Sequence, residues 1–198
     1  GEVWQVRYRA AHAGPKELGC SDAFCDWLFD DDRNGQGGAL MDYCCYGALL
    51  SAIVLGSPSR VTGIAGRLTK DEICVADNAM LTMQYANAIS VAEGSWSQIG
   101  KLGSYMTMIY GTTGTLQVEP RVGGSLLLAD DETPDGRPIE IPEVAPEMQS
   151  ATAHFVACVM GNSPTMELCE PRHARLAQEI LEAGNRSVQR RGAVSLPL

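Results

Sequence analysis

The strongest constraint on the fold is a run of short segments between residues 59 and 129 in which side chains alternate with a period of two. Helical patterns at 37–56, 148–161 and 170–188 stand before and after this run and do not alternate with its segments. Strands gathered in one block with helices outside it predict an α+β fold, with an open, mainly antiparallel sheet and helices packed on one face. The expected strands are 2–12, 59–68, 77–86, 88–97, 104–111, 115–119, 124–129 and a last short one within 193–198. Successive strands of the block are expected to pair as an antiparallel meander.

Composition is consistent with one globular domain over residues 1–198. The chain has 198 residues, of which 45% are hydrophobic and 20% charged, and its formal net charge is −9. An acidic chain repels phosphate backbones, so nucleic acid is not an expected partner. Apolar runs stay shorter than a membrane-spanning helix requires, so no membrane association is expected. The odd count of seven cysteines predicts reduced thiols in a cytoplasmic protein.

Two stretches lack a clear period. Residues 16–37 are expected to form an irregular excursion that Trp27 and Phe29 anchor to the core. The acidic, proline-bearing stretch 130–147 is expected to be a solvated connection.

The sheet face turned away from the helices is also expected to be apolar. In the strands around 79–85 and 104–110, both sets of alternating positions carry apolar side chains. Such a surface usually lies in an interface, so we expect a homodimer or tetramer formed through the sheet.

Sequence motifs for bound nucleotides and metals are missing from this chain. It has no G-x-G-x-x-G between a strand and a helix and no G-x-x-x-x-G-K-[ST] phosphate loop. The closest Cys/His pairs, Cys20 with Cys25 and Cys169 with His173, do not have the C-x2-C spacing that structural zinc favours. We therefore expect no cofactor-binding residues and no metal site within this chain.

Asp42 and Tyr46 are the most informative pair. A spacing of four residues places them on one face of the expected helix at 37–56, whose other side chains are mostly apolar. Burying a carboxylate there is costly unless it is paired or hydrogen-bonded. The pair can be structural, or it can line a cleft with Tyr46 as proton donor or acceptor and Asp42 as its partner.

Further candidates for ligand contact lie at one end of the sheet. His12 ends the first expected strand just before a Gly-Pro turn. Trp96, Lys101 and Tyr105 belong to the stretch SWSQIGKLGSY, residues 95–105, where polar and aromatic groups can meet a polyhydroxylated ligand. The alternative is an ordinary connection between two strands.

The order of these signals resembles the C-terminal domain of the Gfo/Idh/MocA oxidoreductases over nearly all of the chain. The resemblance is carried by Gly37-Gly38-Ala39-Leu40-Met41-Asp42-x-x-x-Tyr46-Gly47, by Asp77-Asn78-Ala79 through Glu93-Gly94-Ser95-Trp96, by Ile109-Tyr110-Gly111-Thr112-Thr113-Gly114-Thr115-Leu116, and by Glu182-Ala183-x-x-x-Ser187 through Leu196-Pro197. Many members have histidine at the position of Tyr46. A tyrosine there resembles the glucose–fructose oxidoreductase and dihydrodiol dehydrogenase branch.

The resemblance implies half of a two-domain enzyme. A Rossmann domain that is absent from this chain would bind NAD or NADP and supply the catalytic lysine. This chain would supply substrate contacts and the oligomer-forming sheet for the oxidation of a sugar, cyclitol or related diol, and would be inactive alone. Tyr46 then matches the acid/base position, Asp42 its partner, and His12 a contact to a substrate hydroxyl.

Two positions depart from the family pattern. Cys44 replaces a glycine of the helix and Leu49 replaces a later acidic residue. These replacements keep open a different class of function, a non-catalytic binding or assembly module that retains the fold.

Overall fold

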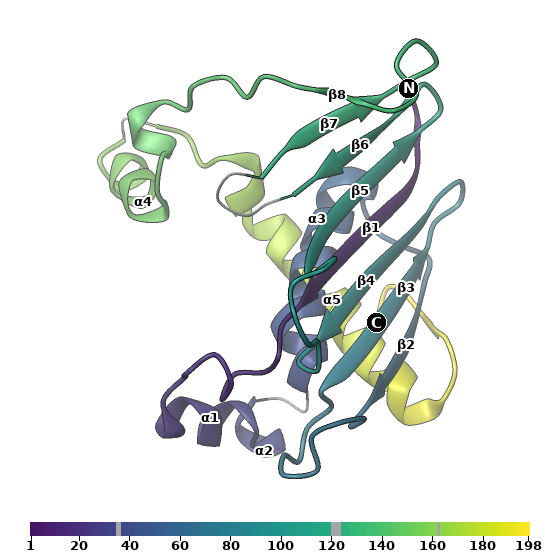
Figure 1. Cartoon of the computed structure of the whole chain (residues 1–198), viewed down its shortest axis with the longest axis vertical. Coiled ribbons are helices and arrows are strands. Elements are labelled where there is room, and N and C mark those ends of the chain that lie inside the picture. Colours follow the sequence, from purple (N-terminus) through teal and green to yellow (C-terminus); the bar gives the residue numbers. More distant parts are fainter. Residues whose placement is uncertain (35–36, 120–123, 162) are drawn as a thin grey trace.

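The centre of the computed structural model, which describes residues 1–34, 37–119, 124–161 and 163–198, is a nine-stranded mixed sheet (Figure 1). In spatial order, the strands are β8 (Arg137–Pro138), β7 (Leu126–Ala129), β6 (Gly114–Val118), β5 (Tyr105–Gly111), β1 (Val3–Ala11), β4 (Ile89–Ser95), β3 (Asn78–Gln84), β2 (Arg60–Gly66) and β9 (Val194–Ser195). The expected α+β class with an open, mainly antiparallel sheet is confirmed.

The predicted meander is wrong at one place. β2, β3 and β4 pair in succession, as do β5, β6 and β7, but β4 and β5 do not pair with each other. β1 lies between them, parallel to β4 and antiparallel to β5, so that Val6 stands opposite Ser90 on one side and Ile109 on the other. The alternation of apolar and polar side chains predicts which residues form a strand, but it does not predict which other strand pairs with it.

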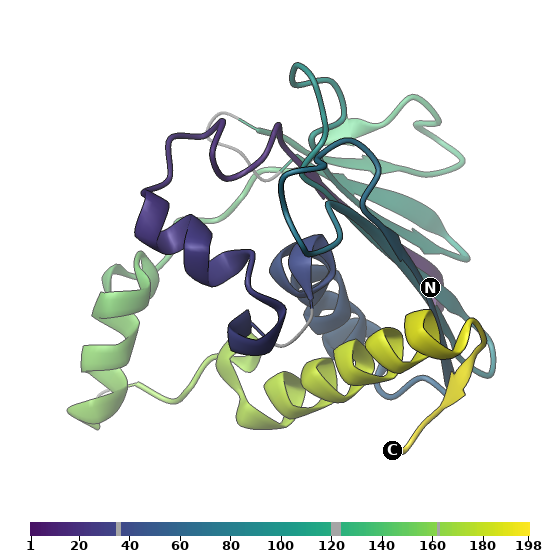
Figure 2. The same ribbon diagram turned by 90° about the horizontal axis from the view of Figure 1, so that it is seen from below.

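Helices cover one face of the sheet (Figure 2). The predicted helix at 37–56 is a π-helix, η1 (Leu40–Cys44), continuing into α3 (Cys45–Leu55), and the predicted helix at 170–188 is α5 (Pro171–Arg190). Gly47 allows α3 to approach β4 closely, because a Cβ at that position would lie 2.4 Å from Ala92 Cβ. The core between sheet and helices is formed by Val61, Leu81, Met83, Ala92, Ala48, Ala52, Ile180 and Leu181.

The excursion at 16–37 is more regular than expected. It contains α1 (Asp22–Leu28) and α2 (Asp31–Asn34). A side chain caps the N-terminus of each helix. Ser21 Oγ accepts the Phe24 N–H, and Asp30 Oδ1 accepts the N–H groups of Asp32 and Arg33. Trp27 is exposed and does not anchor the excursion, whereas Phe29 packs against Trp96 with ring centroids 5.8 Å apart.

The acidic connection at 130–147 is largely exposed and includes the short strand β8. It leads into η2 (Pro146–Met148) and α4 (Ala151–Val159), which is the expected helix at 148–161. η3 (Glu167–Cys169) then joins α4 to α5.

The other face of the sheet, called the open face here, is covered by none of the helices in the described part of the chain (Figure 2). Within the described residues, no helix is long and apolar enough to cross a membrane. All seven cysteines are free thiols.

Asp77, immediately before β3, organises the loop that follows β2. Its buried carboxylate accepts the backbone N–H groups of Leu68, Thr69 and Lys70 at 2.7, 2.8 and 3.0 Å. Burial alone would raise the pKa of this carboxyl, but these donors outweigh it and hold the pKa below its ordinary range. The loop is therefore fixed by an ionised carboxylate.

Replacing Asp77 with Asn should destabilise the fold by about 2–4 kcal/mol, since a charged acceptor of several hydrogen bonds is lost. The pKa of Asp77 in the unfolded chain is near 3.9, and its pKa in the folded protein is lower. The contribution of Asp77 is thus complete above the unfolded pKa and disappears as the pH falls toward the folded pKa. Urea unfolding across the acid range should show a smaller loss of stability for Asp77→Asn than for the wild type. Parallel acid profiles would contradict this assignment.

Candidate functional site

The ends of three neighbouring strands bring the predicted site residues together. β1 ends at Ala11, opposite Ser95 at the end of β4, while Ala10 stands opposite Tyr105 at the start of β5. Because β1 runs parallel to β4 and antiparallel to β5, residues following β1 and β4 emerge beside the first residue of β5. His12, Trp96 and Tyr105 therefore share one end of the sheet.

The π-helix η1 adds Asp42 to this end. η1 packs on β4 and β3, and Trp96 Nε1–H donates a 2.9 Å hydrogen bond to Asp42 Oδ2. The main-chain carbonyl of Asp42 accepts from the Cys45 thiol at 3.3 Å. Among the described residues, no hydrogen bond to Asp42 Oδ1 is present. One oxygen of this carboxylate is therefore held by the indole of Trp96.

The structure places Trp96 differently from the expectation of a direct ligand contact. Its side chain is 0% exposed and packs among Leu28, Ala39, Ile73 and Val75. The segment after β4 turns into the molecule at this point, so the indole supports Asp42 from behind. Trp96 is thus buried and bonded to Asp42, and it is not exposed to a ligand.

Four tyrosines, Tyr8, Tyr43, Tyr46 and Tyr105, form an aromatic group called the tyrosine cluster here. Tyr43 connects its members: its ring centroid is 6.4 Å from those of Tyr46 and Tyr105, and its hydroxyl is 3.3 Å from that of Tyr105. Tyr8 of β1 lies 6.2 Å from Tyr46. Tyr46 is the exposed residue of the tyrosine cluster, with 54% of its surface accessible.

Sequence reasoning missed Tyr8 and Tyr43. Tyr8 alternates with Val6 and Ala10 on the helix-covered face of β1, and that alternation could have indicated that it faces α3. Tyr43 gave no such signal, because its direction depends on the π-helical turn of η1.

The phenol of Tyr46 is held in its protonated form. Partial burial raises its pKa, and the neighbouring Cys45, Asp42 and Tyr105 raise it further because each is negative when ionised. No cationic side chain of the described residues contributes to this shift. A hydroxyl that must lose its proton near neutral pH would need a cation brought from elsewhere.

His12 has a defined tautomer in this site. Its Nδ1 accepts the Gly14 N–H at 2.8 Å, which assigns the ring proton to Nε2 in the neutral form. The ring stands edge-on to Tyr43, with centroids 5.0 Å apart. Burial lowers the pKa of His12. The positive charge of Lys70 lowers this pKa further, whereas the negative charges of Asp42 and Glu17 raise it. At neutral pH, His12 can therefore donate a hydrogen bond from Nε2 to a substrate oxygen.

Lys70 and Glu17 are further residues that the sequence did not single out. Lys70 is buried, and its ammonium forms an ion pair with Glu17 beside Gly14. Because its charge is already matched by Glu17, the pair leaves little excess positive charge to attract an anionic ligand.

Lys101 is exposed in the loop between β4 and β5, and no described contact joins it to the tyrosine cluster. Gln98 holds this loop in place. Its backbone N–H donates to His12 O at 3.0 Å. Its side-chain amide donates to Leu102 O at 3.0 Å and to Ser104 Oγ at 2.7 Å. This geometry ties the loop to His12 and directs Lys101 to solvent.

The described residues suit hydroxyl groups better than metals or phosphates. Residues 1–34, 37–119, 124–161 and 163–198 contain no group of three His, Cys, Asp or Glu side chains able to hold a metal ion. At the end of the sheet, the buried cation Lys70 is paired with Glu17, so these residues do not form a cradle for the phosphates of a dinucleotide. Asp42, His12 and the tyrosines instead offer an acceptor, a neutral donor and phenol hydroxyls.

Comparison with known proteins identifies similar domains. The sequence profile of the GFO/IDH/MocA C-terminal domain matches residues 1–117. No curated protein sequence matches the chain.

Similar solved structures show the same fold at low sequence identity. Levoglucosan dehydrogenase in complex with NADH and levoglucosan is 18% identical, with a TM-score of 0.74 over 100% of this chain and 60% of its own. An NAD-binding oxidoreductase from Klebsiella pneumoniae is 19% identical, with a TM-score of 0.76 over 100% and 60%. An oxidoreductase from Agrobacterium radiobacter, in complex with NAD+, L-tartaric acid and magnesium, is 16% identical, with a TM-score of 0.69 over 98% and 57%. The chain therefore spans less than two thirds of each of these proteins.

Titration of His12 tests the electrostatics of the site. Its pKa, followed by NMR of the ring, should lie below the ordinary value near 6.5. Asp42→Asn should lower the pKa further, because a negative charge that stabilises the imidazolium is removed. Lys70→Met should raise it, because a positive charge is removed. An unchanged pKa in Asp42→Asn would show that the carboxylate does not act on His12.

Proposed function

Since this chain belongs to the GFO/IDH/MocA oxidoreductase family through its C-terminal domain, we propose that it forms the substrate-binding half of an NAD- or NADP-dependent dehydrogenase. Its substrate in this proposal is a neutral sugar, cyclitol or related diol, oxidised at a CH–OH group. The proposal is supported by Tyr43, whose ring lies 5.0 Å from that of His12 and 6.4 Å from that of Tyr46, and which directly follows Asp42 in η1.

Each of these side chains has a distinct task in the proposed reaction. The exposed phenol of Tyr46 takes the proton of the reacting hydroxyl, or returns it in the reverse direction. Oδ1 of Asp42 accepts a hydrogen bond from a neighbouring hydroxyl while Trp96 holds Oδ2. Nε2–H of His12 donates to a substrate oxygen.

The reaction also needs groups from outside this chain. The pKa of Tyr46 is raised here, so a cation must lower it before the phenol can exchange protons near neutral pH. The resemblance to the family gives that role to a lysine of the nucleotide-binding domain, which would also bind the cofactor that accepts the hydride. The isolated chain should accordingly be inactive, and its free thiols support a cytoplasmic setting.

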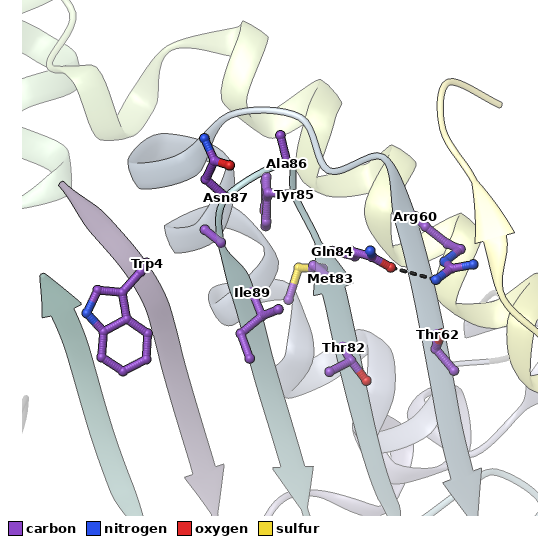
Figure 3. A pocket seen from close by; sticks show the side chains of 11 residues that line it. Trp4, Arg60, Thr62, Thr82, Met83, Gln84, Tyr85, Ala86, Asn87 and Ile89 are labelled. Carbon is purple, nitrogen blue, oxygen red and sulfur yellow. Dashed lines mark hydrogen bonds between the residues drawn. The ribbon is translucent and has the colours of Figure 1, made fainter. Parts of the chain in front are cut away.

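We further propose that two copies associate through the open face. Ile64 and Met80, cross-strand neighbours on β2 and β3, are exposed there. A hollow of about 510 Å³ lies on the same face. Trp4 and Ile89 project there beside polar side chains (Figure 3). An exposed apolar surface rimmed by polar groups is typical of a protein interface.

Replacing Ile64 and Met80 together with Asp tests the proposed association. Two carboxylates in an apolar interface would be desolvated without partners, so the assembly should dissociate to single chains. Light scattering during size exclusion measures the mass. The matched control, Leu18→Asp, changes an exposed leucine away from the sheet and should keep the wild-type mass. A wild-type chain that is already monomeric would overturn the proposal.

Replacing Tyr46 with Phe tests the proposed proton transfer. In the protein that joins this chain to its nucleotide-binding domain, kcat should fall by about 10²-fold or more, because the proton acceptor is removed. Cofactor affinity and thermal stability should remain near the wild-type values, since Tyr46 is an exposed residue.

Tyr110→Phe is the matched control, because the ring of Tyr110 packs at a tilt against Trp4, with centroids 5.3 Å apart, away from the site. Full activity in Tyr46→Phe would exclude the proton-transfer role. A wild-type protein that binds a polyol without oxidising it would favour the non-catalytic module.

A further inference from the structure

α4 carries an exposed apolar face that no described element covers. Phe155, Val159 and Met160 are 69%, 68% and 68% exposed, and Val156 lies between them. Single exposed apolar residues are common on protein surfaces, but a contiguous group on one short helix usually marks an interaction site.

α4 also lacks the packing that stabilises short helices. It has nine residues, and helices of this length are marginal in water unless one face is buried. Among the described elements, its substantial contacts are with the adjacent turn η2. Both views show α4 standing apart from α3 and α5 (Figures 1 and 2). A further contact surface is needed to account for its stability.

The inner side of α4 is nevertheless well ordered. Ser150 Oγ accepts the Ala153 N–H at the start of the helix, and His154 is buried beneath it. His154 Nε2 accepts the Met166 N–H at 3.1 Å, which ties the helix to the segment before η3. This hydrogen bond turns the His154 side of α4 inward. Phe155 and Val159, which are exposed, lie on other sides of the helix.

A groove runs beside this exposed face. It has a volume of about 900 Å³, and its walls combine α4 with the segment at 165–169. The residues that form its apolar walls include Met148, Ala151, Phe155, Val159 and Met166. The groove can accept apolar side chains from a partner.

The position of α4 indicates the partner. α4 lies on the helix-covered side of the sheet, opposite the open face (Figure 2). Tyr46 of α3 and Asp42 of η1 belong to the same side, so a domain that delivers a cofactor to them must approach from there. This chain covers 60% of levoglucosan dehydrogenase, so two fifths of that protein, enough for a domain, lies outside the shared region.

We infer that the apolar face of α4 and its groove are the docking surface for the nucleotide-binding domain. This inference rests on the proposed function, because that function supplies the second domain. It adds a surface of this chain that fixes how the two domains meet.

Hydrogen exchange of the α4 amides tests the docking surface. In the isolated 198-residue chain, these amides should exchange quickly, because little covers the helix. In the protein that contains both domains, they should exchange at least tenfold more slowly. Phe155→Asp with Val159→Asp should remove that protection and reduce kcat at least tenfold, with exchange in β3 and β4 unchanged. Ile141→Asp, an equally exposed residue in the connection before η2, is the matched control and should preserve both readouts.

The outcomes separate this inference from the proposed function. Equal α4 exchange in the isolated chain and the two-domain protein would overturn the docking surface, and so would a double variant that keeps the protection. Protected α4 amides in a two-domain protein that oxidises no diol would support the docking surface and contradict the proposed function alone.

Discussion

The insertion of β1 between β4 and β5 is the constraint on which the rest of the structure depends. It makes the first strand of the chain the centre of the sheet, with hydrogen bonds to a parallel neighbour on one side and an antiparallel neighbour on the other. The same insertion sets His12 between the segment that follows β4 and the start of β5. A strand that paired at the edge of the sheet would leave His12, Trp96 and Tyr105 far apart.

The second determinant is the irregular start of the helix that packs on this sheet. As a π-helix, η1 gives Asp42 and Tyr43 directions that a regular α-helix would not give them. The hydrogen bond from the buried Trp96 fixes Asp42, and the Cys45 thiol donates to the main-chain carbonyl of Asp42. Cys44 is fully buried against the sheet, where its thiol approaches the carbonyl of Ala92 at 3.5 Å, and burial raises its pKa to about 12. The packing between η1 and the sheet therefore accommodates the side chain of Cys44.

Much of the fold could be predicted from local pattern. The alternation in 77–86 and 88–97 indicated β3 and β4, and the glycine and proline after residue 55 indicated the end of α3. The parallel pairing of β1 with β4 could not be predicted, because it joins residues about 85 positions apart and no local signal encodes a distant partner. The burial of Trp96 escaped prediction for a related reason: its sequence neighbours are polar, and only the approach of η1 supplies the acceptor that allows the indole to be buried. Asp42 and Tyr46 were accessible to sequence reasoning because they stand out in an apolar helix, whereas Lys70 and Glu17 come from two loops that meet only in the fold.

The proposed reaction is divided between two domains: this chain would position the hydroxyl and its proton, and a second domain would bind the dinucleotide. Calorimetric titration of the 198-residue chain with NADH and with NADPH tests that division most directly. We predict no binding of either dinucleotide at millimolar concentration. Micromolar binding of either one would contradict it, because the chain would then contain a dinucleotide site of its own.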